Sequence, residues 1–243
     1  MGTDQVGTTK ILVWDAPTRV FHWLLALCFA GAYITSESDR LMGVHLTLGY
    51  TMVGLVAFRV VWGVIGTRYA RFTSFIRGPE AVAKYTSDLL SFKPKTTVGH
   101  NPLGAVSIVL MLLTTLAIVY TGWVYFNGGS HSVKEIHEGV AGFMLVVVGV
   151  HVAGVIYASM TQGENLVGSM VNGYKQGLPK DKIRWSWWPL ALLLLCCVLG
   201  FWYLQWQSPV VNTQGRNIYQ NEGNGYGYSK HGNRGWRGGD DDD

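Results

Sequence analysis

The sequence has few charged residues and few cysteines for its length. Asp, Glu, Lys and Arg make up 14% of the 243 residues, and hydrophobic residues make up 49%, whereas soluble domains carry roughly 25% charged residues. The three cysteines, Cys28, Cys196 and Cys197, lie within apolar runs, where a free thiol behaves as a small hydrophobic side chain. No C-x-x-C or C-x-x-C-H motif occurs, which argues against a zinc ribbon, a redox dithiol and a covalently attached c-type haem.

Long apolar stretches dominate the chain instead. Five are long enough, or nearly so, to cross the bilayer core of about 30 Å, which takes about 20 helical residues. They cover about residues 20–35, 44–66, 103–126, 137–160 and 187–206. Ten tryptophans and twelve tyrosines are typical of aromatic belts at the two membrane interfaces. The sequence therefore predicts an all-α integral membrane protein, with a four-helix transmembrane bundle followed by a fifth transmembrane helix.

The chain divides into three parts on this pattern. Residues 1–177 form the predicted four-helix membrane domain, residues 178–210 contain the fifth transmembrane helix, and residues 211–243 form a tail rich in Gly and Asn that ends in four aspartates. The tail has too little aliphatic content to fold alone, so we expect it to be disordered. The polar interval 67–101 separates the first two helices from the rest, and a short interfacial helix is expected within it at Pro79–Leu90.

Basic residues indicate the orientation of the helices. Two precede the first helix, six lie between the second and third, and four lie between the fourth and fifth: Lys10, Arg19, Arg68, Arg71, Arg77, Lys84, Lys93, Lys95, Lys175, Lys180, Lys182 and Arg184. The other two loops carry one each, Arg40 and Lys134. Since positively charged loops stay in the cytoplasm, we expect a cytoplasmic N-terminus and an extracytoplasmic C-terminus. The basic residues form no stripe beside stacking aromatics, so a nucleic-acid partner is not expected.

Four histidines lie within the predicted membrane helices, where an ionisable residue suggests a function. His137 and His151 are fourteen residues apart on one helix, which corresponds to a rise of about 21 Å and almost four full turns, so both rings project from nearly the same face. The predicted topology places His22 at the inner depth of His151, and His45 at the outer depth of His137. The four histidines therefore sort into an inner pair and an outer pair across neighbouring helices.

Two stacked histidine pairs between helices suit two non-covalent b-type haems with bis-histidine ligation. Such ligation fills both axial positions of the iron, which favours electron transfer over oxygen chemistry. Gly49, Gly139 and Gly142 lie near the outer pair and would give a flat macrocycle room, although close helix packing explains glycine equally well. Arg59 follows His45 by fourteen residues and could bind a propionate of the inner haem, or extend toward the cytoplasmic interface.

Three further histidines are weaker candidates. His131 is the only rival ligand, but it is twenty residues from His151 and is expected to lie beyond the helix. His231 falls in the tail. His100 is at the cytoplasmic edge of the third helix, where a quinone contact is conceivable and a loop or helix-cap role is favoured.

Three separated segments resemble bacterial cytochrome b561-type proteins, especially the b-type cytochrome subunits of nickel–iron hydrogenases. They are residues 14–23 (WDAPTRVFHW), residues 99–104 (GHNPLG) and the run from His151 to Tyr174. The resemblance covers about residues 11–177 and implies a di-haem core of the bacterial inner membrane, with ligands at His22, His45, His137 and His151. It also implies electron passage between membrane quinone and a partner. The fifth helix and the tail depart from the small four-helix members.

The expected function is transfer of electrons between the quinone pool and an extracytoplasmic partner, either a c-type cytochrome or a hydrogenase small subunit. A stand-alone quinone-linked enzyme such as a superoxide oxidase is a second reading, which would need a basic outer surface to attract the anion. A non-haem transporter or anchor subunit is a third, but the repeated halves with broken helices that transporters often show are not evident.

Overall fold

The computed structural model describes residues 9–76, 78–91 and 98–207, and five of its helices are long and apolar enough to cross a membrane. They are α1 (Ala16–Thr35), α2 (Met42–Ile65), α5 (Pro102–Phe126), α6 (His131–Gln162) and α8 (Trp188–Gln207). The all-α, multi-pass membrane architecture predicted from the sequence is therefore confirmed. The predicted tail, residues 211–243, lies outside the described residues.

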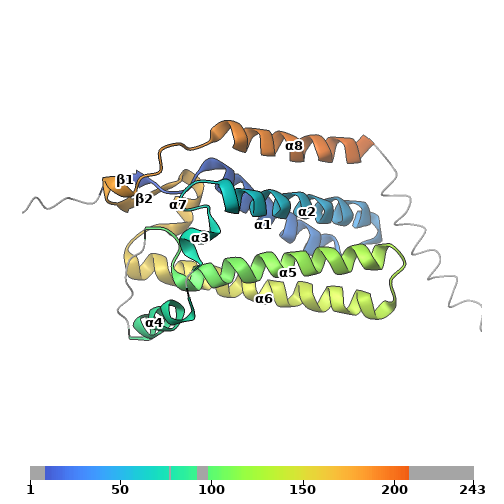
Figure 1. Cartoon of the computed structure of the whole chain (residues 1–243). Helices are drawn as coiled ribbons and strands as arrows, with labels where there is room; N and C mark the ends of the chain where they lie inside the picture. The colour runs from blue at the N-terminus through green and yellow to red at the C-terminus, as the bar shows by residue number, and fades with distance from the viewer. Residues whose placement is uncertain (1–8, 77, 92–97, 208–243) are drawn as a thin grey trace, which may run out of the picture.

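The helices α1, α2, α5 and α6 run side by side as a bundle (Figure 1), in which α1 packs on α2, α5 packs on α6, and α2 contacts α5. Helix α8 lies along the outside of this bundle against α1 and, less extensively, α2. The indole Nε1 of Trp202 on α8 donates a hydrogen bond to Oγ1 of Thr51 on α2 at 2.9 Å. Such a bond between membrane helices is worth about 0.6 kcal/mol, so apolar packing supplies most of the attachment of α8.

The helix ends follow local capping chemistry. Asp15 caps α1 by accepting a hydrogen bond from the backbone N–H of Thr18 at 2.7 Å, and Asn101 caps α5 by accepting one from Gly104 at 2.6 Å. Side-chain oxygens at the N-cap satisfy amides that the helix itself leaves unpaired. Because Asp15 is the cap, α1 begins at Ala16, four residues earlier than its apolar run predicts.

Helix α6 also begins earlier than expected, at His131 instead of His137. The expectation that His131 lies beyond the helix was therefore wrong. Its first turns are polar and are supported by two i,i+4 pairs, His131 with Glu135 at 3.6 Å and Lys134 with Glu138 at 3.9 Å. With 32 residues, α6 is about 48 Å long at 1.5 Å per residue, which exceeds the bilayer core.

Most of the short elements gather at one end of the bundle (Figure 1). They are β1 (Thr9–Leu12), α3 (Phe72–Phe75), α4 (Pro79–Leu90), α7 (Leu166–Asn172), β2 (Tyr174–Gly177) and the 3-10 helix η2 (Pro179–Asp181); a second 3-10 helix, η1 (Asp39–Leu41), precedes α2. The helix α4 has the bounds that the sequence predicts, and it packs against α5.

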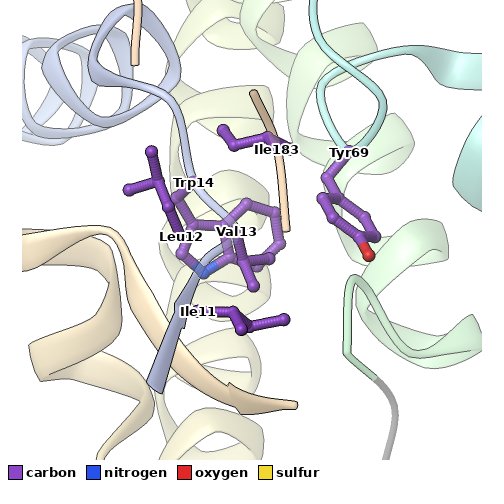
Figure 2. Packing of buried hydrophobic residues seen from close by; sticks show 6 residues of the cluster. All are labelled: Ile11, Leu12, Val13, Trp14, Tyr69 and Ile183. Atoms are coloured by element: carbon purple, nitrogen blue, oxygen red, sulfur yellow. The ribbon is translucent and has the colours of Figure 1, made fainter. Parts of the chain in front are cut away.

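A cap formed by the N-terminal strand closes this end of the bundle. Strand β1 pairs antiparallel with β2, with Lys10 opposite Gln176. Six buried residues form the hydrophobic cluster of the cap (Figure 2): Ile11, Leu12, Val13, Trp14, Tyr69 and Ile183. Gly173 precedes β2 with φ of 90°, and its carbonyl accepts hydrogen bonds from the N–H groups of Val13 and Trp14 at 2.9 and 3.1 Å. A Cβ at Gly173 would lie 2.8 Å from the carbonyl oxygen of Trp14, so this approach requires glycine.

Candidate cofactor sites

The predicted outer histidine pair is brought together across two helices. The rings of His45 on α2 and His137 on α6 have centroids 6.2 Å apart and planes inclined by 74°. A bond between a metal and an imidazole nitrogen is about 2 Å long, and a ring centroid lies roughly 1 Å beyond its nitrogen. Two imidazoles on opposite sides of one metal ion therefore have centroids about 6 Å apart, which agrees with the observed separation.

Backbone carbonyls fix which nitrogen of each outer ring is available. The Nδ1 of His45 lies 2.8 Å from the carbonyl oxygen of Ala32, and the Nδ1 of His137 lies 2.9 Å from that of Ile118. A carbonyl oxygen only accepts, so each Nδ1 carries the proton and donates it. The lone pair of each ring is then on Nε2, the arrangement in which a histidine binds a metal while its other nitrogen is held by the protein.

A cavity of about 710 Å³ contains both outer rings, and this volume falls within the range of about 300–1,000 Å³ typical of ligand pockets. Its wall is mostly aromatic and aliphatic, with polar groups from Lys134 and Glu138. Gly49 lines the cavity, and no atom lies within 4 Å of the position that a Cβ would take there. At Gly49 the alternative of close helix packing is therefore wrong, since the glycine borders open space.

The other glycines near this pair differ in role. Gly139 and Gly142 also have nothing within 4 Å of a Cβ position, but they do not line the cavity. Gly122 on α5, which the sequence reasoning missed, does line it, and a Cβ there would lie 3.0 Å from Cε1 of His137. Glycine at this position lets α5 approach the imidazole closely.

The predicted inner pair, His22 on α1 and His151 on α6, lies nearer the capped end. The two side chains are close enough to interact electrostatically. The Nδ1 atom of His22 is buried and has no hydrogen-bond partner among the described residues, and its ring contacts Trp23 edge to face at 5.1 Å. A buried polar atom without a partner costs free energy, so it suggests a group that the protein atoms do not supply.

Arg59 is buried near this inner pair, with 3% of its surface exposed. Its guanidinium lies over the rings of Phe72 and Phe75, at 4.7 and 5.9 Å from their centroids. Its Nη1 atom is buried and has no hydrogen-bond partner among the described residues. Arg59 is therefore covered by the short helix α3, and both the propionate contact and the extension toward the cytoplasmic interface stay predictions.

His100 lies in the same region, one residue before the cap of α5. Its ring is 4.6 Å from the ring of Trp14 and 4.6 Å from that of Phe75, and its Nδ1 is buried without a hydrogen-bond partner in the described part of the chain. Burial first, and then the positive charge of Arg59, lower the pKa of His100 from 6.5 to about 3. Asn101 caps α5, so His100 does not have the helix-cap role that the sequence favoured.

The remaining histidines do not join either pair. His131 begins α6 with a side chain that is 74% exposed, and His231 lies outside the described residues. Within residues 9–76, 78–91 and 98–207, no three His, Cys, Asp or Glu side chains gather as a metal site would require. A pair of histidines suffices only when the other ligands belong to the cofactor, as the four pyrrole nitrogens of a haem do.

Comparison with known proteins decides the family. The family model described as prokaryotic cytochrome b561 matches residues 13–173, which contain all four membrane histidines. The chain belongs to the prokaryotic cytochrome b561 family. As a b561 cytochrome it is a multi-pass membrane protein whose cofactor is haem b and whose role is electron transport.

The curated relatives of this b561 cytochrome carry consistent names. It is 25% identical over 229 residues to a probable Ni/Fe-hydrogenase B-type cytochrome subunit of Rhizobium leguminosarum bv. viciae, with 74% of this chain and 94% of the relative covered. Proteins of the same name are 26% identical in Azotobacter vinelandii (69% and 89% covered) and 23% identical in Escherichia coli K12, there as the hydrogenase 1 subunit (67% and 89% covered). No solved structure matches the chain.

Proposed function

We propose that this b561 cytochrome holds two non-covalent haem b groups, each bound by two histidines, and passes electrons between the membrane quinone pool and an extracytoplasmic redox partner. The outer haem is held by His45 and His137, and the inner haem by His22 and His151. The observation that carries the proposal is the outer pair, whose ring separation of 6.2 Å suits one iron between two imidazoles.

The proposal assigns the iron-binding role to one ring nitrogen of each histidine. His45 and His137 present Nε2 to the iron because backbone carbonyls hold their Nδ1 protons. With two histidines to each iron, no position would be left for oxygen, so the bound haem would supply electron transfer and not oxygen chemistry. The protein contributes binding, orientation and exclusion of water.

Arg59 is assigned to the inner haem. A guanidinium that is 3% exposed needs an anion to offset its desolvation. Asp15 attracts Arg59 electrostatically, but its carboxylate accepts hydrogen bonds from Thr18, Trp62 and Thr67, and Nη1 of Arg59 has no hydrogen-bond partner among the described residues. The carboxylates of a haem are the remaining anions that membership of this family supplies. Arg59 would thereby hold the inner haem by charge while His22 and His151 hold its iron.

The partner follows from the names of the relatives. The curated relatives are described as hydrogenase cytochrome subunits, so a nickel–iron hydrogenase is the first partner to test and a c-type cytochrome the second. The basic loops support a cytoplasmic N-terminus in a bacterial inner membrane, which puts the outer haem on the partner's side. The described residues at that end include the acids Glu37, Asp39, Glu135 and Glu138 against the bases Arg40 and Lys134, which disfavours a superoxide oxidase that must attract an anion.

Two sets of alanine variants test the proposal. His45→Ala and His137→Ala should each lose the same haem, while His22→Ala and His151→Ala should each lose the other, so the haem content falls from about two per chain to about one. Haem content is measured after extraction, and the two haems are distinguished by redox titration of the reduced absorption bands. His131→Ala is the matched control, since that ring is exposed, and it should retain both haems. Loss of the same haem in His22→Ala and His45→Ala would contradict the pairing, and a colourless wild-type protein would refute the function.

A further inference from the structure

Two buried polar atoms without partners lie against the same aromatic ring at the capped end of the bundle. The guanidinium of Arg59 is 5.9 Å from the centroid of Phe75, and the imidazole of His100 is 4.6 Å from it. Nη1 of Arg59 and Nδ1 of His100 are both buried, and neither has a hydrogen-bond partner among the described residues. Native proteins pair nearly all such atoms, so each of these two atoms needs a partner beyond the described residues.

The charges in this region indicate what the missing group is. Arg59 is always cationic and can only donate. Burial first, and then the charges of Arg59 and Lys175, keep the imidazole of His100 neutral, with one N–H to donate. When its proton is on Nδ1, His100 can donate to the same acceptor as Arg59, and the charge of Arg59, which Asp15 offsets only in part, favours an anion as that acceptor.

The nearby acids of the described chain are already engaged. The carboxylate of Asp15 accepts hydrogen bonds from Trp62 and Thr67 in addition to its capping role. Glu164 is paired with Lys175 at 3.4 Å. Neither acid is a hydrogen-bond partner of Nη1 of Arg59 or Nδ1 of His100 among the described residues, so a further anion would complete this site.

We propose that Arg59 and His100 form one carboxylate-binding site, and that its occupant is a propionate of the haem held by His22 and His151. This inference rests on the proposed function, since it needs an inner haem. It adds His100, on the loop before α5, as a residue that positions the haem without binding its iron. Phe72 and Phe75 of α3 hold the guanidinium in place by cation–π contact.

The enclosure of the site favours a tethered carboxylate over a free anion. Arg59 is 3% exposed and Trp14, which contacts His100, is 6% exposed. Trp14 belongs to the hydrophobic cluster of the cap (Figure 2), which covers this end of the bundle. A free anion would have to shed its water and cross this cover, whereas a propionate arrives with a macrocycle that is itself apolar and anchored by two imidazoles.

The experiment compares two cofactors in the full-length protein. Apoprotein in detergent is reconstituted with iron protoporphyrin IX or with its dimethyl ester, in which both propionates are neutral. Wild-type protein should bind the acid form at the inner site more tightly than the ester. A hydrogen bond to a charged group contributes about 1.5–3 kcal/mol, so Arg59→Gln and His100→Phe should each reduce this preference roughly tenfold or more.

Matched variants separate this effect from loss of folding. His100→Phe retains a ring between Trp14 and Phe75 while it removes the donor, and His100→Gln retains a donor and should restore part of the preference. Arg68→Gln is the control for Arg59→Gln, since Arg68 is largely exposed and pairs with Asp181. A second readout is the midpoint potential of the inner haem, which should fall in Arg59→Gln because the cation that offsets the propionate charge is gone.

The outcomes separate the inference from the function on which it rests. An acid-to-ester preference that is the same in wild type, Arg59→Gln and His100→Phe would overturn the carboxylate site, even if both haems bind. A second outcome is that the preference is unchanged, but added acetate or phosphate raises the melting temperature of the wild type and not that of Arg59→Gln. The occupant is then a free anion, and the propionate assignment is wrong. If His151→Ala removes no haem, the proposed function fails first.

Discussion

The open space beside Gly49 allows a test of the outer pocket that leaves the histidines untouched. In Gly49→Leu the new side chain projects from α2 where no atom lies within 4 Å of its Cβ. Leucine favours the helix by about 1 kcal/mol over glycine, so the fold should not be weakened. The side chain would instead take part of the 710 Å³ cavity that His45 and His137 share.

The size of the effect follows from steric crowding. Forcing extra methylene groups into an occupied site costs about 1–3 kcal/mol, and each 1.4 kcal/mol is a factor of ten in affinity. The outer haem should therefore bind roughly 5- to 150-fold more weakly, while the inner haem, held by His22 and His151, is retained. The measurement is haem per chain as purified haem-saturated protein is diluted, together with a redox titration that identifies which haem is lost.

Gly54→Leu is the matched control. It lies on the same helix, also has nothing within 4 Å of a Cβ, and does not line the cavity. It should gain the same helix propensity and keep both haems. Equal haem retention in the two variants, with both proteins folded, would refute the idea that this cavity holds a haem, and equal loss would show that the effect is not steric.

Two further predictions concern the capped end. Asp15→Ala removes the acceptor of buried donors on Trp62 and Thr67 as well as the N-cap of α1, so it should destabilise the protein by about 2–4 kcal/mol. Thermal unfolding in detergent measures this, and an unchanged melting temperature would contradict it. In the haem-free protein, burial and Arg59 depress the pKa of His100 to about 3, below the 6.5 of the unfolded chain. Because the unfolded state then binds the proton first, stability should be constant above pH 6.5 and fall as the pH drops from 6.5 toward 3. His100→Gln should show a shallower acid loss, and parallel pH curves would exclude His100 as the cause.

The helices could be predicted because a helix that spans the membrane requires a long apolar run, which is visible in the sequence. Apolar runs and flanking basic residues located five helices, and capping residues explain the small differences at their ends. His131 was misplaced because the first turns of α6 are polar and continue the helix beyond its apolar run. Local hydrophobicity cannot reveal such an extension, although the i,i+4 charge pair of Lys134 and Glu138 could have done so.

The outer pair was predictable for a related reason, since helical spacing and alternation of direction place His45 and His137 at one depth. The environment of Arg59 and His100 could not be predicted from the sequence. It depends on Phe75 of a four-residue helix and on Trp14 of the cap, which meet His100 only after the chain has folded. Contacts between residues this far apart in sequence have no local signal, so the donors without partners became visible only in the structure.

The pairing of β1 with β2 has a consequence for how the protein is made. Residues 9–12 are synthesised before their partner strand at residues 174–177, which follows only after α1, α2, α5 and α6 have been synthesised. The hydrogen bonds between β1 and β2 can therefore form only after α6 has been synthesised. Closure of the cap by this strand pair therefore cannot precede the synthesis of residues 174–177.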